Sequence, residues 1–209
     1  GSGSRASQEA LIRAARRVQG VENASIFVND QDPINTVDGL EPHEVEMVIE
    51  GGNSNEIAQA LFNTKAAGDI LVGGVHGVEV AEAVSLSNGQ TTQISYSNPE
   101  KVQIYIDVDV LVTNEFSDKN YIKDSIVSYI GGLFSSGNED GGELSVGDNV
   151  IYGQVEYSVR DVNGVFDINS LTVGTTASPS KTSNISIEEF QLSITNALDE
   201  SITVTTNTI

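Results

Sequence analysis

Two histidines are the only imidazole side chains in this sequence, and imidazole is the side chain used most often for acid–base catalysis and metal binding. His43 lies between a proline and a glutamate, whereas His76 lies in a glycine-rich stretch. Zinc sites hold their ligands at characteristic short spacings, and no such spacing joins these two residues. We therefore expect structural roles for both histidines and no bound metal.

The glycine-rich stretch Gly-Gly-Val-His-Gly at 73–77 could let a backbone approach a phosphate group closely. It lacks the order G-x-G-x-x-G, and it does not lie between a strand and a long helix. A Gly-Lys-Ser/Thr phosphate-binding loop is also missing from the sequence. The sequence therefore predicts no nucleotide site and no cofactor.

Several carboxylates are close in sequence, which is the arrangement that general acid–base catalysis and calcium binding require. Asp107 and Asp109 share one strand face because side chains alternate along a strand. Asp30, Asp32 and Asp38 share a loop, but they lack the register of a calcium-binding loop. No G-x-S-x-G nucleophile motif is present. We expect solvated carboxylates and no enzymatic activity; a hydrolase of unknown substrate remains the least favoured alternative.

The length and composition limit the classes of protein to which the chain can belong. Its 209 residues suffice for two small domains that bury about 70% of the unfolded surface. No apolar run approaches the roughly 20 residues of a membrane span, and no cysteine is present. Residues 1–4 resemble an expression scar or linker, and the only methionine is Met47. We therefore expect a fragment of a longer protein, without membrane partners.

The charge balance is strongly acidic, with 30 acidic against 10 basic residues and a net charge of −20. Nucleic acid is an unsuitable partner, because binding to phosphates depends on lysine and arginine. One interpretation is an ordinary soluble protein that self-repulsion keeps dispersed. The other, which we favour, is a halophilic protein, because molar salt shortens the Debye length to about 3 Å and so removes the cost of crowded acids.

The hydrophobic periodicity predicts an α+β fold. In the first half, the expected elements are a helix at 7–18, strands at 24–28 and 45–49, a helix that begins at Asn53 or Ser54 and stops near 67–68, and strands at 77–86, 91–96 and 102–113. In the second half, they are helices at 119–133 and after Asp148-Asn149, and strands at 170–173, 185–190 and 201–206. An Asn88-Gly89 pair predicts a hairpin.

These elements suggest two consecutive small α/β-sandwich units, each a mixed or antiparallel sheet with helices on one face. The first unit covers residues 5–114 and the second covers residues 115–209, and the long strand 102–113 joins them. A repeated phrase, V-x-G-V, occurs at 18–21 and again at 162–165. Gly20 and Gly164 permit the tight geometry that ends a helix, and Val21 and Val165 then begin a strand. Chance similarity of a common junction is the alternative explanation.

Four stretches of the sequence carry a resemblance to a known family. They are VQGVENASIFVN (18–29), DGLEPHEVEMVIEGG (38–52) followed by EIAQAL (56–61), VNGV (162–165), and NISIEEF (184–190) with ITVT (202–205). Across nearly the whole chain they resemble the carboxyl-terminal part of the baseplate J-like protein family, which builds the wedges of contractile tails. The unusual acidity suggests a haloarchaeal tailed virus or a provirus.

The most specific of these stretches also has a direct physical interpretation. Gly39 relaxes a turn, and Pro42 stiffens the start of a strand. Gly51 and Gly52 let the chain fold straight back into a helix, whose apolar face then covers the sheet with Ile57 and Leu61. This stretch is an architectural module and holds no catalytic device.

The resemblance implies a structural protein of the virion tail baseplate, made in a high-salt host cytoplasm. It implies a ring around the tail tube, self-association into dimers or a ring, and contact with other wedge and sheath-initiating proteins. The alternative that remains open is an adhesin-like module that binds a host surface or a carbohydrate.

Two segments could supply interfaces for such an assembly. Arg13, Arg16 and Arg17 form a basic helix face on an acidic chain, although exposed ion pairs within the chain would explain them equally well. Ile202 and Val204 belong to the alternating segment 201–209, which could be an open edge strand. An edge that pairs only within its own sheet is the simpler interpretation, and both remain open.

Overall fold

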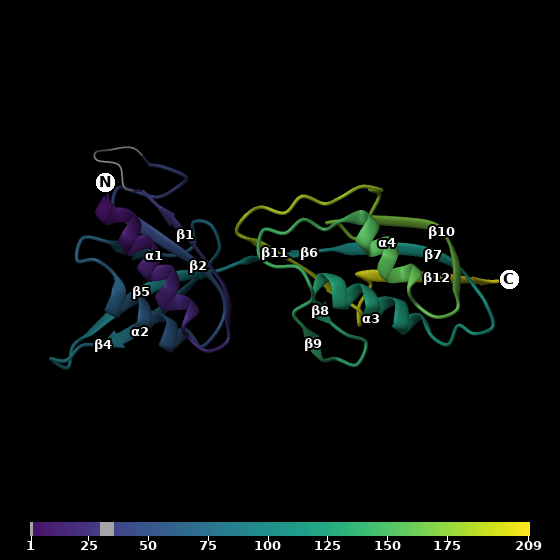
Figure 1. The fold of residues 1–209 in the computed structure, drawn as a ribbon, viewed down its shortest axis with the longest axis horizontal. Helices are drawn as coiled ribbons and strands as arrows, with labels where there is room; N and C mark the ends of the chain where they lie inside the picture. Colours follow the sequence, from purple (N-terminus) through teal and green to yellow (C-terminus); the bar gives the residue numbers. More distant parts are fainter. Residues whose placement is uncertain (1, 30–35) are drawn as a thin grey trace. The chain divides into compact units, whose positions relative to one another are not determined.

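The computed structural model describes residues 2–29 and 36–209, with side chains from Ser7 onward. It confirms an α+β fold and divides the chain into two compact units, residues 1–100 and 101–209 (Figure 1). The helix at the start of the first unit runs from Ser2, so residues 2–4, expected to be a linker, are helical.

In residues 2–29 and 36–100, the first unit contains two helices and a five-stranded sheet. Its elements are α1 (Ser2–Arg16), β1 (Val21–Val28), β2 (Glu44–Gly51), α2 (Ser54–Thr64), β3 (Ile70–Val72), β4 (Val78–Ser85) and β5 (Thr91–Asn98). The strand order is β1-β2-β5-β4, and β3 pairs with β2. β2 is antiparallel to β1 and parallel to β5, whereas β4 and β5 form the expected hairpin.

The helices α1 and α2 lie on the same side of this sheet (Figure 1). Met47, Ile49 and Tyr96 project from the sheet into the core beneath them, where Ile57 and Leu61 of α2 are also fully buried. Asn53, one of the two residues considered for the start of this helix, caps α2, because its side chain accepts hydrogen bonds from two backbone N–H groups of the first turn. The opposite face of β2 is buried as well, which explains its long run of buried residues.

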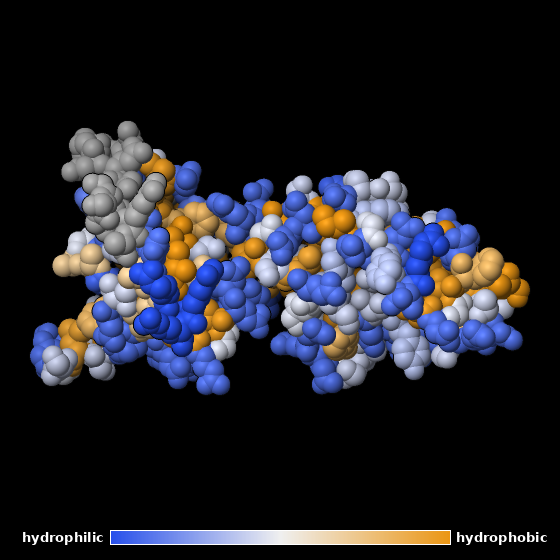
Figure 2. All heavy atoms as spheres, viewed as in Figure 1, coloured by the Kyte–Doolittle hydropathy of each residue, from blue (hydrophilic) through white to orange (hydrophobic). Residues whose placement is uncertain are grey.

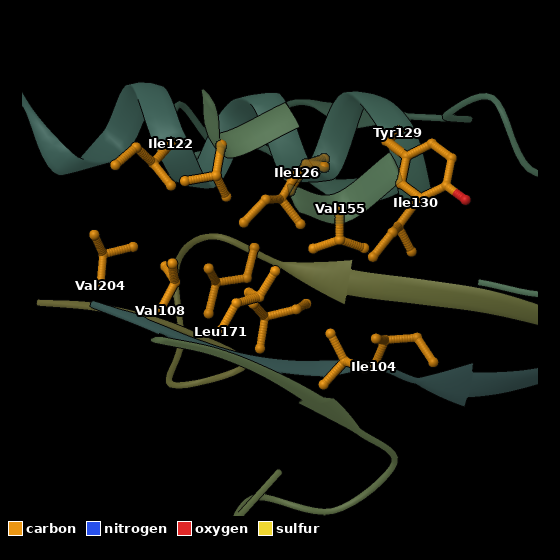
Figure 3. Packing of buried hydrophobic residues seen from close by; sticks show 14 of the residues in the cluster. Ile104, Val108, Ile122, Ile126, Tyr129, Ile130, Val155, Leu171 and Val204 are labelled. Atoms are coloured by element: carbon orange, nitrogen blue, oxygen red, sulfur yellow. The ribbon is translucent and has the colours of Figure 1, made fainter. Parts of the chain in front are cut away.

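The second unit contains two helices and two small sheets. Its elements are β6 (Glu100–Gln103), β7 (Tyr105–Val112), α3 (Lys119–Ile130), β8 (Gly132–Leu133), β9 (Glu139–Asp140), α4 (Tyr152–Arg160), β10 (Val165–Gly174), β11 (Gln191–Asn196) and β12 (Ile202–Thr208). The strand orders are β10-β7-β12 and β6-β11-β8-β9. Figure 3 shows Ile122 and Ile126 of α3 and Val155 of α4 facing Val108, Leu171 and Val204 of the three-stranded sheet.

The boundary between the units differs from the expectation. It lies between Glu100 and Lys101 and not after residue 114. The strand β7 therefore does not join two units; it is the central strand of the second unit's sheet. The physical reason is that its alternate residues Ile106, Val108 and Val110 are fully buried in the core of the second unit.

The expected strand at 185–190 is also wrong, whereas the last expected strand, 201–206, is present as β12. Ile185 makes only an isolated bridge with Val150, and the strand begins at Gln191. The helix expected after Asp148-Asn149 begins at Tyr152, whose N–H donates to the side chain of the distant Asn184 at 3.0 Å and not to a preceding residue. The Asn149 side chain instead accepts a hydrogen bond from the Ile187 backbone N–H at 2.8 Å.

The two units share one arrangement of helices and strands. In the first, β2 is antiparallel to β1 and parallel to β5; in the second, β7 is antiparallel to β10 and parallel to β12. α1 packs on β1 and α2, and α4 packs on β10 and α3. The chain connects the matching elements in a different order in each unit, so the similarity lies in packing and not in topology.

The repeated V-x-G-V phrase builds the same turn in both units. Gly20 and Gly164 each have φ +85°. The Val21 N–H donates to the Val18 carbonyl at 3.2 Å, and the Val165 N–H donates to the Val162 carbonyl at 3.1 Å. The two turns join the matching pairs α1–β1 and α4–β10, which confirms the expected helix–glycine–strand junction.

Candidate functional site

Glu46 is the most unusual polar residue in the described part of the chain, because its carboxylate is fully buried. It lies on β2 and points away from the helices, since its neighbour Met47 points into the helix-covered core. A buried charge is costly unless hydrogen bonds and a partner compensate for it. The surroundings of this carboxylate therefore indicate what it does.

The loop 73–77 wraps around the Glu46 carboxylate and donates to both oxygens. Oε1 accepts from the backbone N–H groups of Val75 at 3.0 Å and His76 at 3.1 Å, and Oε2 accepts from the His76 N–H at 2.9 Å. The His76 ring nitrogen Nδ1 lies 2.6 Å from Oε2. The glycine-rich loop thus binds a carboxylate of its own chain with the backbone groups that other loops offer to phosphates.

Ser97 of β5 completes this cluster. Its hydroxyl donates to Glu46 Oε1 at 2.5 Å and accepts from the Gly74 N–H at 2.8 Å. In a serine hydrolase the serine must donate to the histidine that takes its proton. Here the hydroxyl donates to the carboxylate instead, so the geometry does not activate Ser97 as a nucleophile.

The His76 ring also stacks on Phe27 of β1, with ring centroids 3.9 Å apart and an angle of 10° between the planes. Only 11% of the His76 side chain is exposed. Three strands and the loop therefore meet at one buried polar cluster, which we call the Glu46 cluster: Glu46, His76, Ser97 and Phe27. Its contacts hold the loop against the sheet.

Sequence reasoning expected a structural role for His76 but missed Glu46 and Ser97. A signal for Glu46 was present in β2. In a strand with one solvated face, both Glu46 and Val48 would be polar, whereas here the run 45–49 has a single polar residue. This pattern indicates that both faces of β2 are buried. The Glu46 carboxylate therefore needs hydrogen-bond donors within the protein.

His43 lies apart from this cluster, at the start of β2, with φ +67°. It lines a small pocket of about 180 Å³ together with Asn29, Asp69 and residues of α1. Among residues 2–29 and 36–209, no group of three or more histidine, aspartate or glutamate side chains could hold a metal ion. Asp30 and Asp32 lie outside the described residues.

Gly20, Gly51 and Gly52, from two of the four stretches that carry the family resemblance, meet at one point of the first unit. A side chain on Gly51 would place its Cβ 2.2 Å from the Gly20 carbonyl oxygen, so the two backbones touch. A Cβ on Gly52 would lie 2.6 Å from Val21 and 3.1 Å from Ile57. Two stretches that are distant in sequence thus form one close backbone crossing.

The other residues of these stretches have local or core roles. Asp38 and Gly39 both have positive φ in a two-residue turn that Val37 and Leu40 close. A Cβ on Gly39 would lie 2.7 Å from Val75, so this turn reaches the loop that holds Glu46. Pro42 lies half-buried in the turn before β2, and Leu61 is fully buried in the core.

A similar contact occurs at Gly164 in the second unit. A Cβ there would lie 2.3 Å from the Phe116 backbone nitrogen. The Gly164 carbonyl accepts from the Thr113 N–H at 2.8 Å, and Val165 packs against the core as β10 begins. The repeated glycine therefore both turns the chain and permits a close backbone approach.

Asp107 and Asp109 share the outer face of β7, as their spacing predicted. Asp109 Oδ1 accepts from the side-chain amides of Asn169 at 2.9 Å and Asn207 at 2.6 Å, so it links three strands. Asp107 is exposed. These carboxylates line an open sheet face and not a cleft.

The proposed interface residues have different surroundings. Figure 2 shows strongly hydrophilic side chains over α1, where Arg13, Arg16 and Arg17 are exposed. Arg13 pairs with Glu9 at 3.1 Å, and Arg17 has no ion-pair partner in the described part of the chain. Ile202 and Val204 are 1% and 6% exposed, so an interface at this strand would use its backbone edge and not these two side chains. Because side chains alternate along a strand, both point into the core of the second unit.

Burial raises the pKa of the Tyr96 phenol to about 12, and the nearby Glu82 carboxylate adds to the shift. Because the folded pKa lies above the ordinary value of 10.0, stability is fully present below pH 10 and is lost as the pH rises through the folded pKa. We expect the free energy of unfolding to fall by about 1.4 kcal/mol per pH unit between these values. Denaturant titrations of wild type and Tyr96→Phe across this range test the prediction; an equal slope in both proteins would contradict it.

Comparison with models of known protein families finds no match to this chain. No curated protein matches it significantly in sequence. In the part of the chain that the structure describes, no helix is long and apolar enough to cross a membrane. Any assignment of function therefore depends on the chain's own residues and geometry and on the resemblance of its four stretches.

Proposed function

We propose that the chain is a structural component of the baseplate wedge of a contractile-tail virus or a related injection system, and that it assembles into a ring around the tail tube. The observation that carries this proposal is the structural role of glycines in the stretches that resemble the baseplate J-like family. Gly20, Gly51 and Gly52, which belong to two of those stretches, permit a close approach of two backbone segments. Close backbone packing favours a rigid domain, which is what a structural protein of an assembly requires.

The Glu46 cluster supports the same proposal. Glu46, His76 and Ser97 carry the side chains that a hydrolase would use, yet each oxygen of Glu46 is occupied by donors that fix the loop 73–77. A carboxylate that is fully buried and hydrogen-bonded on both oxygens is well suited to rigidity and poorly suited to a reaction in water. The partners we infer are other wedge and sheath-initiating proteins and further copies of this chain.

The test is immunogold electron microscopy of whole particles, with an antibody raised against this chain. We expect gold at the tail end nearest the host. An antibody against a sheath protein, which should label the tail along its length, is the control. Absence of label on particles whose tails are accessible would contradict the proposal.

One observation favours the adhesin alternative. The outer face of the β10-β7-β12 sheet carries Asp109, Asn169 and Asn207, whose carboxylate and amide groups are of the kind that hydrogen-bond sugar hydroxyls. An adhesin would use this polar sheet face to bind glycans. Gold on fibre tips or on the cell envelope would support this function and contradict the baseplate.

The net charge of −20 leads to a prediction for salt. We propose a high-salt host, in which screening relieves repulsion between the carboxylates. We expect the free energy of unfolding to rise from dilute buffer to molar KCl, as measured by thermal unfolding at several KCl concentrations. Sucrose, which favours burial without screening charge, serves as the control. Equal stability in dilute and molar KCl would contradict a halophilic origin.

A further inference from the structure

β12 differs from the other sheet edges in the described residues, because it lacks the features that normally prevent edge-to-edge pairing. Proteins protect edge strands with charges, proline, bulges or very short strands. β12, Ile202–Thr208, contains no charge and no proline. It pairs with β7 over seven consecutive residues without a bulge. Its outer edge is therefore regular and uncharged, and it is accessible toward its C-terminal end, where Asn207 and Thr208 are exposed.

Each of the other edges carries at least one such feature. β4 carries Glu79 and Glu82, and β1 carries Glu22 and a bulge. β10 has two bulges and the Asp167–Arg160 ion pair. β3 has only three residues, β9 has two, and β6 begins with a glutamate and a lysine. Among the described edge strands longer than three residues, β12 is the only one without a charged residue.

The hydrogen-bonding direction shows which groups the open edge presents. The Ser201 carbonyl accepts from the Ile106 N–H at 2.7 Å, and the Ile209 N–H donates to the Val112 carbonyl at 3.1 Å. Both are odd-numbered, and in a regular strand alternate residues direct their backbone groups to opposite sides. The backbone N–H and C=O groups of Val204 and Thr206 therefore point to the outer edge. Those of Ile202 point the same way, but this residue is only 1% exposed, so the accessible part of the edge lies toward the C-terminal end of β12.

We infer that this edge pairs antiparallel with β12 of a second copy of the chain, around a two-fold axis perpendicular to the sheet. Self-pairing suits this strand because no like charges come opposite each other, as Glu79 or Glu82 would if β4 paired with itself. The two-fold axis keeps equivalent faces together, so Ile202 and Val204 stay on the core side and Thr203 and Thr205 on the outer side.

Such pairing would join two three-stranded sheets into one continuous sheet, which is closer to the usual size of four to six strands. The charge of −20 on each copy opposes association at low ionic strength. The dimer is therefore strengthened by salt. This inference rests on the self-association within the proposed function and assigns a surface to it.

The experiment is sedimentation velocity in molar KCl over a wide range of protein concentration. We expect a wild-type dimer. The variants Thr203→Lys/Thr205→Lys and Thr203→Glu/Thr205→Glu change only exposed side chains, and in the proposed dimer they bring like charges together across the two-fold axis. Each variant alone should raise the Kd by about tenfold or more. An equal mixture of the two should restore the dimer, because opposite charges then meet.

The matched control is Phe166→Lys/Ser170→Lys, which adds the same charge at exposed positions of the same sheet but on β10. It should dimerise as wild type does. Amide exchange of the wild type gives an independent measurement: the Val204 and Thr206 N–H groups should exchange more slowly as concentration rises, whereas that of Thr205, directed toward β7, should not change.

A wild-type monomer throughout, or undiminished dimers of both charged variants, would overturn the inference. Pairing of wild type with an unrelated chain and not with itself would also overturn it. These outcomes are separate from the localisation test. Gold at the baseplate with a monomeric protein would contradict the β12 pairing alone, and a dimer without label on particles would contradict the proposed function alone.

Discussion

Replacement of Glu46 by alanine is expected to lower the free energy of unfolding of the first unit by about 3–5 kcal/mol, the range for a broken buried pair. The side chain is fully buried. Its removal leaves the N–H groups of Val75 and His76 and the Ser97 hydroxyl without their hydrogen-bond acceptor. Each buried group left without a partner costs about 1–3 kcal/mol. The loop 73–77 would then lose its attachment to β2.

The measurement is hydrogen exchange of the β2 and loop amides, because it reports on the first unit separately from the second. Glu22→Ala removes an exposed glutamate from the same sheet and should change stability by no more than about 0.5 kcal/mol. Glu46→Gln should lie between the two, since its amide oxygen can still accept from Ser97 while its NH₂ group faces the His76 N–H. Similar stabilities for Glu46→Ala and Glu22→Ala would contradict a clamping role.

Replacement of Gly164 by alanine is expected to destabilise the second unit by about 2–5 kcal/mol, the sum of two costs. A residue with a Cβ at φ +85° costs about 1–2 kcal/mol. The new Cβ would also lie 2.3 Å from the Phe116 backbone nitrogen, and such overpacking adds about 1–3 kcal/mol. Because the contact is with backbone, a change of rotamer cannot relieve it.

Gly137→Ala is the matched control, because Gly137 also has φ +85° but no atom lies within 4 Å of its Cβ position. It should cost only the conformational part, about 1–2 kcal/mol. The difference between the two variants, measured by hydrogen exchange of β10 and α3 amides, isolates the close approach at the repeated glycine. Equal losses would show that the V-x-G-V phrase encodes only a turn.

Sequence reasoning succeeded where a feature depends on residues that are close in the chain. Asn53 caps α2, Asn88-Gly89 turns a hairpin, and both V-x-G-V phrases end a helix beside a glycine. Each of these needs only a side chain or a positive φ within a few residues. The shared face of Asp107 and Asp109 follows from alternation alone.

Sequence reasoning failed where a feature depends on packing against a segment that is distant in the chain. The domain boundary depended on which core buries β7, and alternation shows that a strand has a buried face without showing which helices cover it. For the same reason the sequence did not show that the side chains of Ile202 and Val204 lie in the core of the second unit. Their register with β7 places them there across about ninety-six residues of sequence.

The sequence by itself therefore determined the helices, the turns, the alternation of the strands and the acidic surface, because each depends on local backbone preference or on composition. Tertiary structure alone decided the Glu46 cluster and the open edge of β12. His76 and Ser97 reach Glu46 from 30 and 51 residues away. An edge exists only once the sheet has its final order, because a strand's pattern is the same whether a neighbour pairs with it or not.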